Sequence, residues 1–183
     1  MLFTEKTIKL KDGRNAVLRG YRREDAPEVL ELMKKISGET EFIVRYPEEW
    51  ESCTVGQEEA WIEDAVSSPN KLALCCTVDG RIVGNCEIRF YTSKKLAHRS
   101  VAGVSVLREY WGLGIGSAFF AELIAAANEK GSGLIELEFV EGNDRARRLY
   151  EKFGFRVVSE RPYAFRLKDG GYRKEFYMQK LLK

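Results

Sequence analysis

The chain has 183 residues, of which 44% are hydrophobic and 32% charged, and its net charge is +2. This size and composition are typical of one globular domain with a sizeable core, so we expect residues 1–183 to form a single domain. No apolar run approaches the roughly 18 residues of a membrane span, no basic stripe with interleaved aromatic residues indicates nucleic acid, and one histidine leaves little material for a zinc site or a His-based triad. We expect no membrane, no nucleic acid and no metal.

The N-terminal segment contains no apolar stretch of the kind that a secretory signal peptide needs. The four cysteines form no C-x-x-C pair, and the adjacent Cys75 and Cys76 are expected to face opposite sides of a strand. Reduced thiols in a cytoplasmic protein fit these features best. The oligomeric state stays open, with a homodimer among the alternatives.

The small net charge hides two segments of opposite sign. Between Glu24 and Asp64 there are 13 acidic and three basic residues, and between Asp144 and Lys183 there are 12 basic and five acidic ones. These runs are either solvated helix faces, or an acidic wall for a cationic ligand and a basic wall for an anionic one.

Hydrophobic periodicity and turn residues predict a mixed sheet with helices packed on it, rather than a repeated βαβ unit. The expected elements, in chain order, are strands at 7–10 and 14–20, helices at 26–36 and 55–66 with a loop at 37–53 between them, a hairpin at 71–78 and 81–91, a strand at 99–107, a long helix ending at Gly131, a strand at 134–140, a helix at 144–153, and a last hairpin at 155–167 and 172–181. Asp25 with Glu28 is the predicted cap of the first helix, and Thr54 with Gln57 forms a capping box for the second.

The most informative stretch is VSVLREYWGLGIGSAFFAELI, where a strand passes into a helix. Gly112, Gly114 and Gly116 alternate there, and glycines permit positive φ and let a ligand approach the main chain. N–H groups at a helix start, together with the helix dipole, form an anion site, so we expect a phosphate-bearing ligand. A P-loop would need Gly-Lys-Ser/Thr, and a dinucleotide site would need G-x-G-x-x-G, so the spacing argues against both.

A second motif follows in LEFVEGNDRARRLYEKFGF. With the glycine turn it resembles the GNAT superfamily of N-acetyltransferases, whose cofactor motif [Q/R]-x-x-G-x-[G/A] corresponds to residues 111–116. The family's downstream pattern N-x-x-A-x-x-L-Y-x-x-x-G-F is matched by residues 143–155 at every named position. The sequence looks most like the branch of ribosomal-protein and diamine acetyltransferases. Trp111 departs from the pattern, since it stands where the family has Gln or Arg.

The resemblance implies a mixed, mostly antiparallel sheet of about seven strands with about four helices, whose central parallel strands splay to hold acetyl-CoA. Val104, Ser105 and Val106 would pair their backbone with the pantetheine arm. The pyrophosphate would be held by the backbone of the turn, which comprises Gly112, Leu113, Gly114, Ile115, Gly116 and Ser117. Asn143 would bond the pantetheine amide, or it serves only as the helix N-cap, and both roles are compatible.

The implied reaction moves an acetyl group from acetyl-CoA to a primary amine by direct attack. Tyr150 is the candidate acid for the CoA thiolate, because a phenol keeps its proton at neutral pH. Its alternative role is that of a core tyrosine. Glu138 is the candidate base and Glu87 its competitor, and either one is alternatively a solvent-facing strand residue.

The resemblance implies an acceptor that is a small-molecule amine, a protein N-terminus or a lysine, and we expect a cationic one because of the acidic segment. A non-catalytic module that binds acetyl-CoA or another acyl-CoA as a sensor is the alternative function. Tyr150 and Glu138 argue against it, because a binder needs neither residue.

Overall fold

The structure is a computed structural model that describes residues 1–182. Its eight strands form one sheet in the order β1-β2-β3-β4-β5-β6-β8-β7. Only β5 and β6 run parallel, so the predicted mixed and mostly antiparallel sheet is confirmed, with eight strands in place of about seven. The strands are β1 (Lys6–Lys9), β2 (Asn15–Gly20), β3 (Lys71–Val78), β4 (Arg81–Phe90), β5 (Arg99–Val106), β6 (Leu134–Val140), β7 (Arg156–Arg166) and β8 (Tyr172–Leu181).

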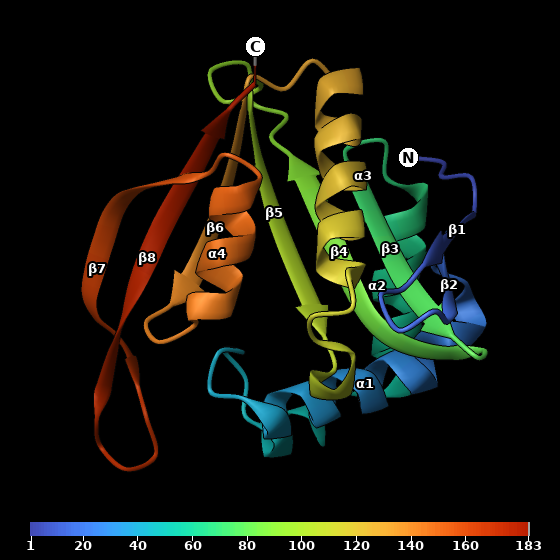
Figure 1. The fold of residues 1–183 in the computed structure, drawn as a ribbon, viewed down its shortest axis with the longest axis horizontal. Coiled ribbons are helices and arrows are strands. Elements are labelled where there is room, and N and C mark those ends of the chain that lie inside the picture. The colour runs from blue at the N-terminus through green and yellow to red at the C-terminus, as the bar shows by residue number, and fades with distance from the viewer. Residues whose placement is uncertain (183) are drawn as a thin grey trace.

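Four α-helices cover the sheet, as predicted. They are α1 (Ala26–Glu39), α2 (Val55–Ser67), α3 (Ile115–Glu129) and α4 (Asp144–Lys152), and three short 3₁₀ turns accompany them: η1 (Arg23–Asp25), η2 (Pro47–Trp50) and η3 (Arg108–Tyr110). Helices α3 and α4 lie on one face of the sheet, and α2 lies on the other, with α1 crossing one end of the strands (Figure 1). Among residues 1–182, no helix combines the length and the apolar character needed to cross a membrane.

The connection between α1 and α2 differs from the expected loop at 37–53. Helix α1 continues to Glu39, and the connection contains the turn η2. Ser37 is buried, and its hydroxyl accepts a hydrogen bond from the Trp50 indole at 2.9 Å. This tertiary contact holds Ser37 and the following Gly38 in the helix, although both residues have low helix propensity.

The cap predicted for α1 is wrong, because tertiary partners take its side chains. Asp25 accepts hydrogen bonds from the Arg19 guanidinium at 2.6 and 2.9 Å and makes no cap bond to α1. Glu28 accepts instead from the backbone N–H of Ile82 at 2.8 Å, at the start of β4. The capping box of Thr54 and Gln57 on α2 is confirmed.

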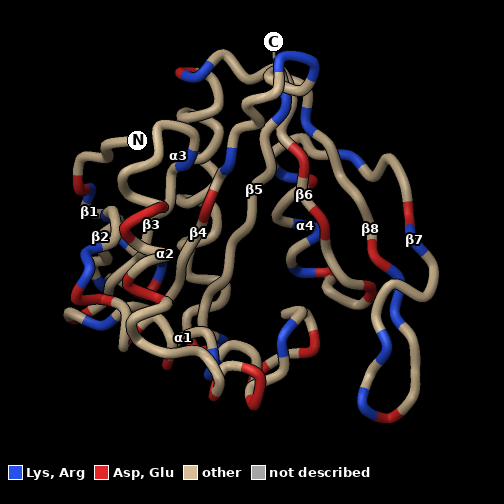
Figure 2. Tube along the Cα trace, turned by 180° about the vertical axis from the view of Figure 1, so that it is seen from behind, with Lys and Arg blue, Asp and Glu red and all other residues tan. Residues whose placement is uncertain are grey.

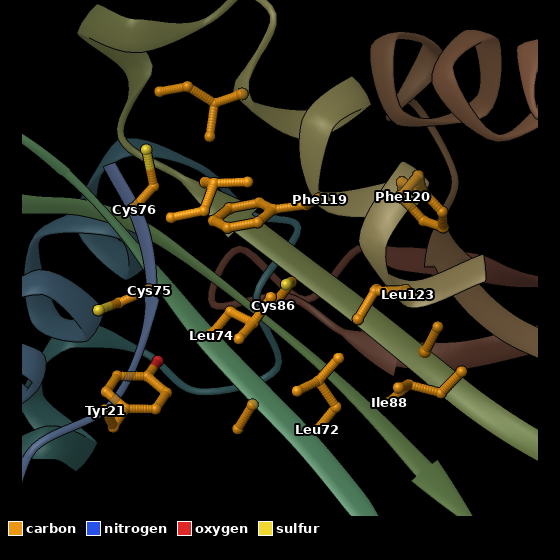
Figure 3. Packing of buried hydrophobic residues seen from close by; sticks show 14 of the residues in the cluster. Tyr21, Leu72, Leu74, Cys75, Cys76, Cys86, Ile88, Phe119, Phe120 and Leu123 are labelled. Carbon is orange, nitrogen blue, oxygen red and sulfur yellow. The ribbon is translucent and has the colours of Figure 1, made fainter. Parts of the chain in front are cut away.

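The core lies between the sheet and α3, where Phe119 packs over side chains of β3 and β4 (Figure 3). Phe120 of the same helix packs against the rings of Tyr150 and Phe155. Cys75 and Cys76 are both fully buried, because both faces of β3 are covered, and the four cysteines are free. Burial raises the pKa of each of these two thiols to about 12, so both stay protonated at neutral pH.

The sheet opens between its two parallel strands. Strand β5 pairs with β6 only from Arg99 to Val101, opposite Leu134 to Glu136, although both strands continue for several residues. Beyond these pairs, β5 stays bonded to β4 and β6 to β8, so the two halves of the sheet diverge (Figure 1). The backbone of β5 that faces β6 therefore lacks a strand partner over residues 102–106.

Candidate active site

A cavity of about 450 Å³ lies where β5 and β6 diverge. Its walls come from the end of β5, the glycine turn, the start of α3, the end of β6, α4, and the connection between α1 and α2. Eleven of the sequence-predicted site residues line it. They are Val104, Ser105, Val106, Gly112, Gly114, Ile115, Gly116, Ser117, Asn143, Glu138 and Tyr150.

The glycine turn has the conformation of an anion cradle. Gly112 and Gly114 have φ values of +79° and +109°, in the left-handed region that side-chain-bearing residues avoid. Helix α3 begins directly after Gly114 with no acidic residue in its first turn. Its first N–H groups have no carbonyl partner inside the helix, and the helix dipole adds positive potential there. Leu113 lies outside the cavity lining, and its carbonyl accepts from the Lys11 N–H at 3.1 Å.

Trp111 fills part of the gap beside β5. Its indole N–H donates to the Val106 carbonyl at 2.6 Å, which occupies one acceptor on the unpaired strand edge. The Arg145 guanidinium stacks on the same ring, 3.1 Å from its centroid. Burial lowers the pKa of Arg145 to about 10, and Arg108 nearby acts in the same direction, so Arg145 still carries its charge at neutral pH. The Trp111–Arg145 stack joins parts of the chain that no local motif connects, and sequence reasoning missed it.

Helix α4 presents two of the predicted residues. The Asn143 side-chain oxygen accepts from the Ala146 N–H at 3.2 Å, so Asn143 caps the helix while it lines the cavity. Tyr150 is 7% exposed, and its ring packs edge-on against Phe120 and Phe139, with centroids 5.3 and 6.0 Å away. Burial raises the pKa of Tyr150 to about 12, and the Arg145 charge opposes this shift.

The two candidate bases are in different places. Glu138, near the end of β6, lines the cavity with its neighbour Phe139. Glu87 lies on β4 opposite Gly103, is ion-paired with Arg89 at 2.9 Å and does not line the cavity. Burial raises the pKa of Glu87. Only Glu138 is therefore placed in the same cavity as Tyr150.

The charges in the cavity are mainly basic. Lys11, Arg145, Arg148 and Lys152 line it, and Glu138 is the only acidic residue that does so in the described part of the chain. Acidic segments are seen around α1 and α2 in Figure 2, but none of the acidic side chains between Glu24 and Asp64 lines the cavity. Many of these acids form ion pairs, such as those that join Glu48 to Lys168 and Glu41 to Arg173 in the β7–β8 hairpin. Within residues 1–182, no group of three or more His, Cys, Asp or Glu side chains is arranged to hold a metal ion.

Comparison with known proteins identifies the class of protein that this fold and cavity define. A family model described as the acetyltransferase (GNAT) family matches residues 36–155, so the chain belongs to the GNAT family of acetyltransferases. It is an acetyl-CoA-dependent N-acetyltransferase, and acetyl-CoA is its cosubstrate. The glycine cradle, the open edge of β5 and the basic lining fit a ligand that carries phosphates and a peptide-like arm.

Individual relatives agree with this assignment. The chain is 28% identical over 123 residues to an L-amino acid N-acetyltransferase of Escherichia coli. The matched region covers 66% of this chain and 75% of the relative. It resembles the structure of a GNAT-family acetyltransferase from Streptococcus pneumoniae with a TM-score of 0.84, 24% identity and coverage of 91% and 99% of the two chains. A structure of an acetyltransferase from Salmonella typhimurium with its cofactor acetyl-CoA matches with a TM-score of 0.78, 20% identity and coverage of 92% and 94%.

Proposed function

We propose that the enzyme acetylates a primary amine by direct attack of the amine on the thioester of acetyl-CoA, within a ternary complex. The observation that carries this proposal is the shared cavity of Tyr150, a proton donor, and Glu138, a proton acceptor. The two residues lie on α4 and β6, beside the open edge of β5. A sensor that only binds acyl-CoA would need neither group.

In the proposed reaction, Glu138 takes one proton from the acceptor ammonium, directly or through water, and frees the nitrogen lone pair. The nitrogen then bonds to the acetyl carbon, the C–S bond breaks, and its electron pair stays on sulfur. Tyr150 donates its hydroxyl proton to the thiolate, and the second proton of the attacking nitrogen restores the phenol. Glu138 releases its proton to water, so the products are an amide, CoA and one proton.

The cosubstrate would be held by the groups that line the cavity away from Glu138. We propose that the backbone of residues 112–117 holds the pyrophosphate, that Val104, Ser105 and Val106 pair with the pantetheine arm, and that Asn143 bonds the pantetheine amide. Arg145 would add a side-chain charge beside the pyrophosphate, where Trp111 itself offers none.

We propose that the acceptor approaches as a cation. The reason is the charge of Glu138 in the cavity, and not the charge of the acidic segment at residues 24–64. Glu138 is the acidic group that meets an acceptor in the cavity, whereas the acids of residues 24–64 lie outside it. Ribosomal-protein N-termini and diamines, which the sequence motifs suggest, are both cationic amines. Free L-amino acids, which the relative from Escherichia coli acetylates by its name, also carry an ammonium group.

The test is a panel of amines incubated with acetyl-CoA, with release of free thiol as the readout. The panel contains L-amino acids, polyamines, peptides with free N-termini and the same peptides with blocked N-termini. We expect thiol release with at least one unblocked amine and transfer of the acetyl group to its nitrogen by mass spectrometry. Tight binding of acetyl-CoA without turnover on any amine would contradict the enzymatic proposal and favour the sensor.

A further inference from the structure

A ladder of three glutamates runs across β6 and β8. Glu138 lies opposite Tyr177, and Val140 lies opposite Glu175. Because alternate residues of a strand share a face, Glu136 and Glu138 of β6 project on the same side of the sheet as Glu175 of β8. The charged segments of β6 and β8 are seen side by side in Figure 2. Of the three, Glu138 lines the cavity, and Glu175 lies diagonally across from it on β8.

Glu136 is a structural member of this ladder. It is 1% exposed, and its carboxylate accepts from Arg99 at 2.9 Å and from Gln179 at 2.9 Å. A buried carboxylate with a cation and an amide donor has its charge balanced and its lone pairs used. Glu136 therefore has no free basic function.

Glu138 and Glu175 are different, because together they have one cation. Arg161 of β7 pairs with Glu175 at 2.7 Å, while Glu138 has no ion pair within residues 1–182. Glu175 is 9% exposed, and Glu138 is its diagonal neighbour on the same face of the sheet, one same-face pair along the β6–β8 register. Burial raises the pKa of Glu175, the neighbouring Glu138 raises it further, and Arg161 opposes both effects.

Other charged side chains near this pair have partners of their own: Arg173, two residues before Glu175 on β8, is ion-paired with Glu41 at 3.8 Å. Tyr177 lies between the pair and the balanced Glu136–Arg99 contact, and Glu141 is engaged by the backbone N–H of Lys174 at 3.1 Å. From the connection between α1 and α2, the cavity lining near β6 receives Thr40, Phe42 and Ile43, which are uncharged. Two carboxylates with one arginine thus retain a net charge of about −1 at the cavity wall, and a shared proton would relieve it.

We propose that Glu138 and Glu175 act as a coupled carboxyl pair in which Glu138 accepts the acceptor ammonium's proton and Glu175 is the positioning residue that shares it. This inference rests on the proposed function and extends it to a residue on β8. The proton leaves the nitrogen for a Glu138 oxygen, is shared with Glu175, and passes to water after the transfer.

The test compares Glu175→Gln with Glu138→Gln and with the control Glu160→Gln, which removes an exposed carboxylate paired with Lys174 on the same hairpin. In Glu175→Gln, the amide oxygen can still accept from Arg161, but the second negative charge is gone. A like-charge neighbour raises the pKa of a base, so its removal lowers that pKa. We expect the acid limb of the pH profile of kcat/KM to shift to lower pH by about 0.5 pH unit or more. The plateau value of kcat/KM should fall severalfold, and the Kd of acetyl-CoA should stay unchanged.

The variants should separate the two roles. Glu138→Gln should lose about 100-fold in kcat, more than Glu175→Gln, and Glu160→Gln should keep both the rate and the acid limb. The proposed coupling would be refuted if the acid limb of the kcat/KM profile of Glu175→Gln lay within about 0.2 pH unit of that of the wild type, with both proteins measured in the same buffer series.

A measurement on the wild-type protein avoids any folding defect of the variants. Carbon-13 NMR of the glutamate side-chain carboxyls should show two coupled steps for this pair, one of them above the ordinary range of glutamate. Two independent steps in the ordinary range would refute the proposal. This readout needs no substrate, so its failure is distinguishable from the failure of the proposed acetyl transfer, which the amine panel detects.

Discussion

Replacing Tyr150 by phenylalanine removes one hydroxyl group from the cavity and keeps the ring in place. The ring packs against Phe120 and Phe139, and the substitution preserves these contacts. The Tyr150 hydroxyl has no hydrogen-bond partner in the protein, although every fully buried polar side-chain atom in residues 1–182 has one. The hydroxyl is therefore not fully buried, and it opens onto the cavity that Tyr150 lines. Because no protein hydrogen bond is lost, we expect the melting temperature to change by less than about 2 °C.

The magnitude of the kinetic effect follows from the proposed role of the hydroxyl. With a pKa of about 12, roughly one molecule in 10⁴ is ionised at pH 8, so nearly every enzyme molecule carries the proton that the thiolate needs. General acid catalysis is typically worth about 10²- to 10⁴-fold, or roughly 3–5 kcal/mol of activation free energy. We therefore expect kcat to fall at least about tenfold, with the Kd of acetyl-CoA within about fivefold of wild type, because one hydroxyl contact contributes about 1 kcal/mol.

The assay is single-turnover release of free thiol at saturating acceptor, so that chemistry limits the observed rate. Tyr21→Phe is the matched control, since it removes another buried phenol hydroxyl, one that belongs to a ring packed against Trp61 of α2. A Tyr150→Phe enzyme with wild-type single-turnover rates would refute the acid role. Tyr150 would then be a packing residue, and the thiolate would take its proton from water or from the amine.

Substitutions at three further positions test the cofactor side of the cavity. Gly114→Glu and Gly114→Ala both strain a backbone with φ of +109°, but only Gly114→Glu adds a negative charge. Calorimetry should therefore show acetyl-CoA affinity at least about 100-fold weaker in Gly114→Glu and less than about tenfold weaker in Gly114→Ala. Equal losses of affinity in the two variants would contradict an anion site at this turn. Trp111→Phe keeps an aromatic ring beneath Arg145 but removes the hydrogen bond to the Val106 carbonyl. That carbonyl is then free to pair with the pantetheine arm, so acetyl-CoA should bind up to about tenfold more tightly. Weaker binding would show instead that the indole N–H itself contacts acetyl-CoA. Arg145→Met should weaken acetyl-CoA binding and reduce its dependence on salt, and an unchanged salt dependence would place this charge away from the phosphates.

Much of the architecture was predictable because its signals are local. The Asp79-Gly80 turn takes positive φ at both residues, 51° and 80°, which is what a two-residue hairpin between twisted strands requires. The capping box at Thr54 and the apolar spacing in α4 are also short-range patterns. The end of α1 and the partner of Asp25 were mispredicted, because Trp50 and Arg19 reach them from elsewhere in the fold.

The sequence by itself determined the family and many of the residues that line the cavity. Both the glycine turn and the pattern at residues 143–155 are contiguous motifs. In each motif, the residue types are set by the backbone conformation of the turn or by their place on a helix face. Only the tertiary structure placed Glu138 rather than Glu87 in the cavity and kept the acidic side chains of residues 24–64 out of its lining. It also brought Arg145 onto Trp111 and Glu175 diagonally across from Glu138. These contacts join residues from different strands and helices, and neither the register of β6 against β8 nor the divergence of β5 from β6 is visible in any window of the chain. Side-chain charges interact through space over a few ångströms, and the pairing of strands, not the pattern along the chain, sets which carboxylates are neighbours.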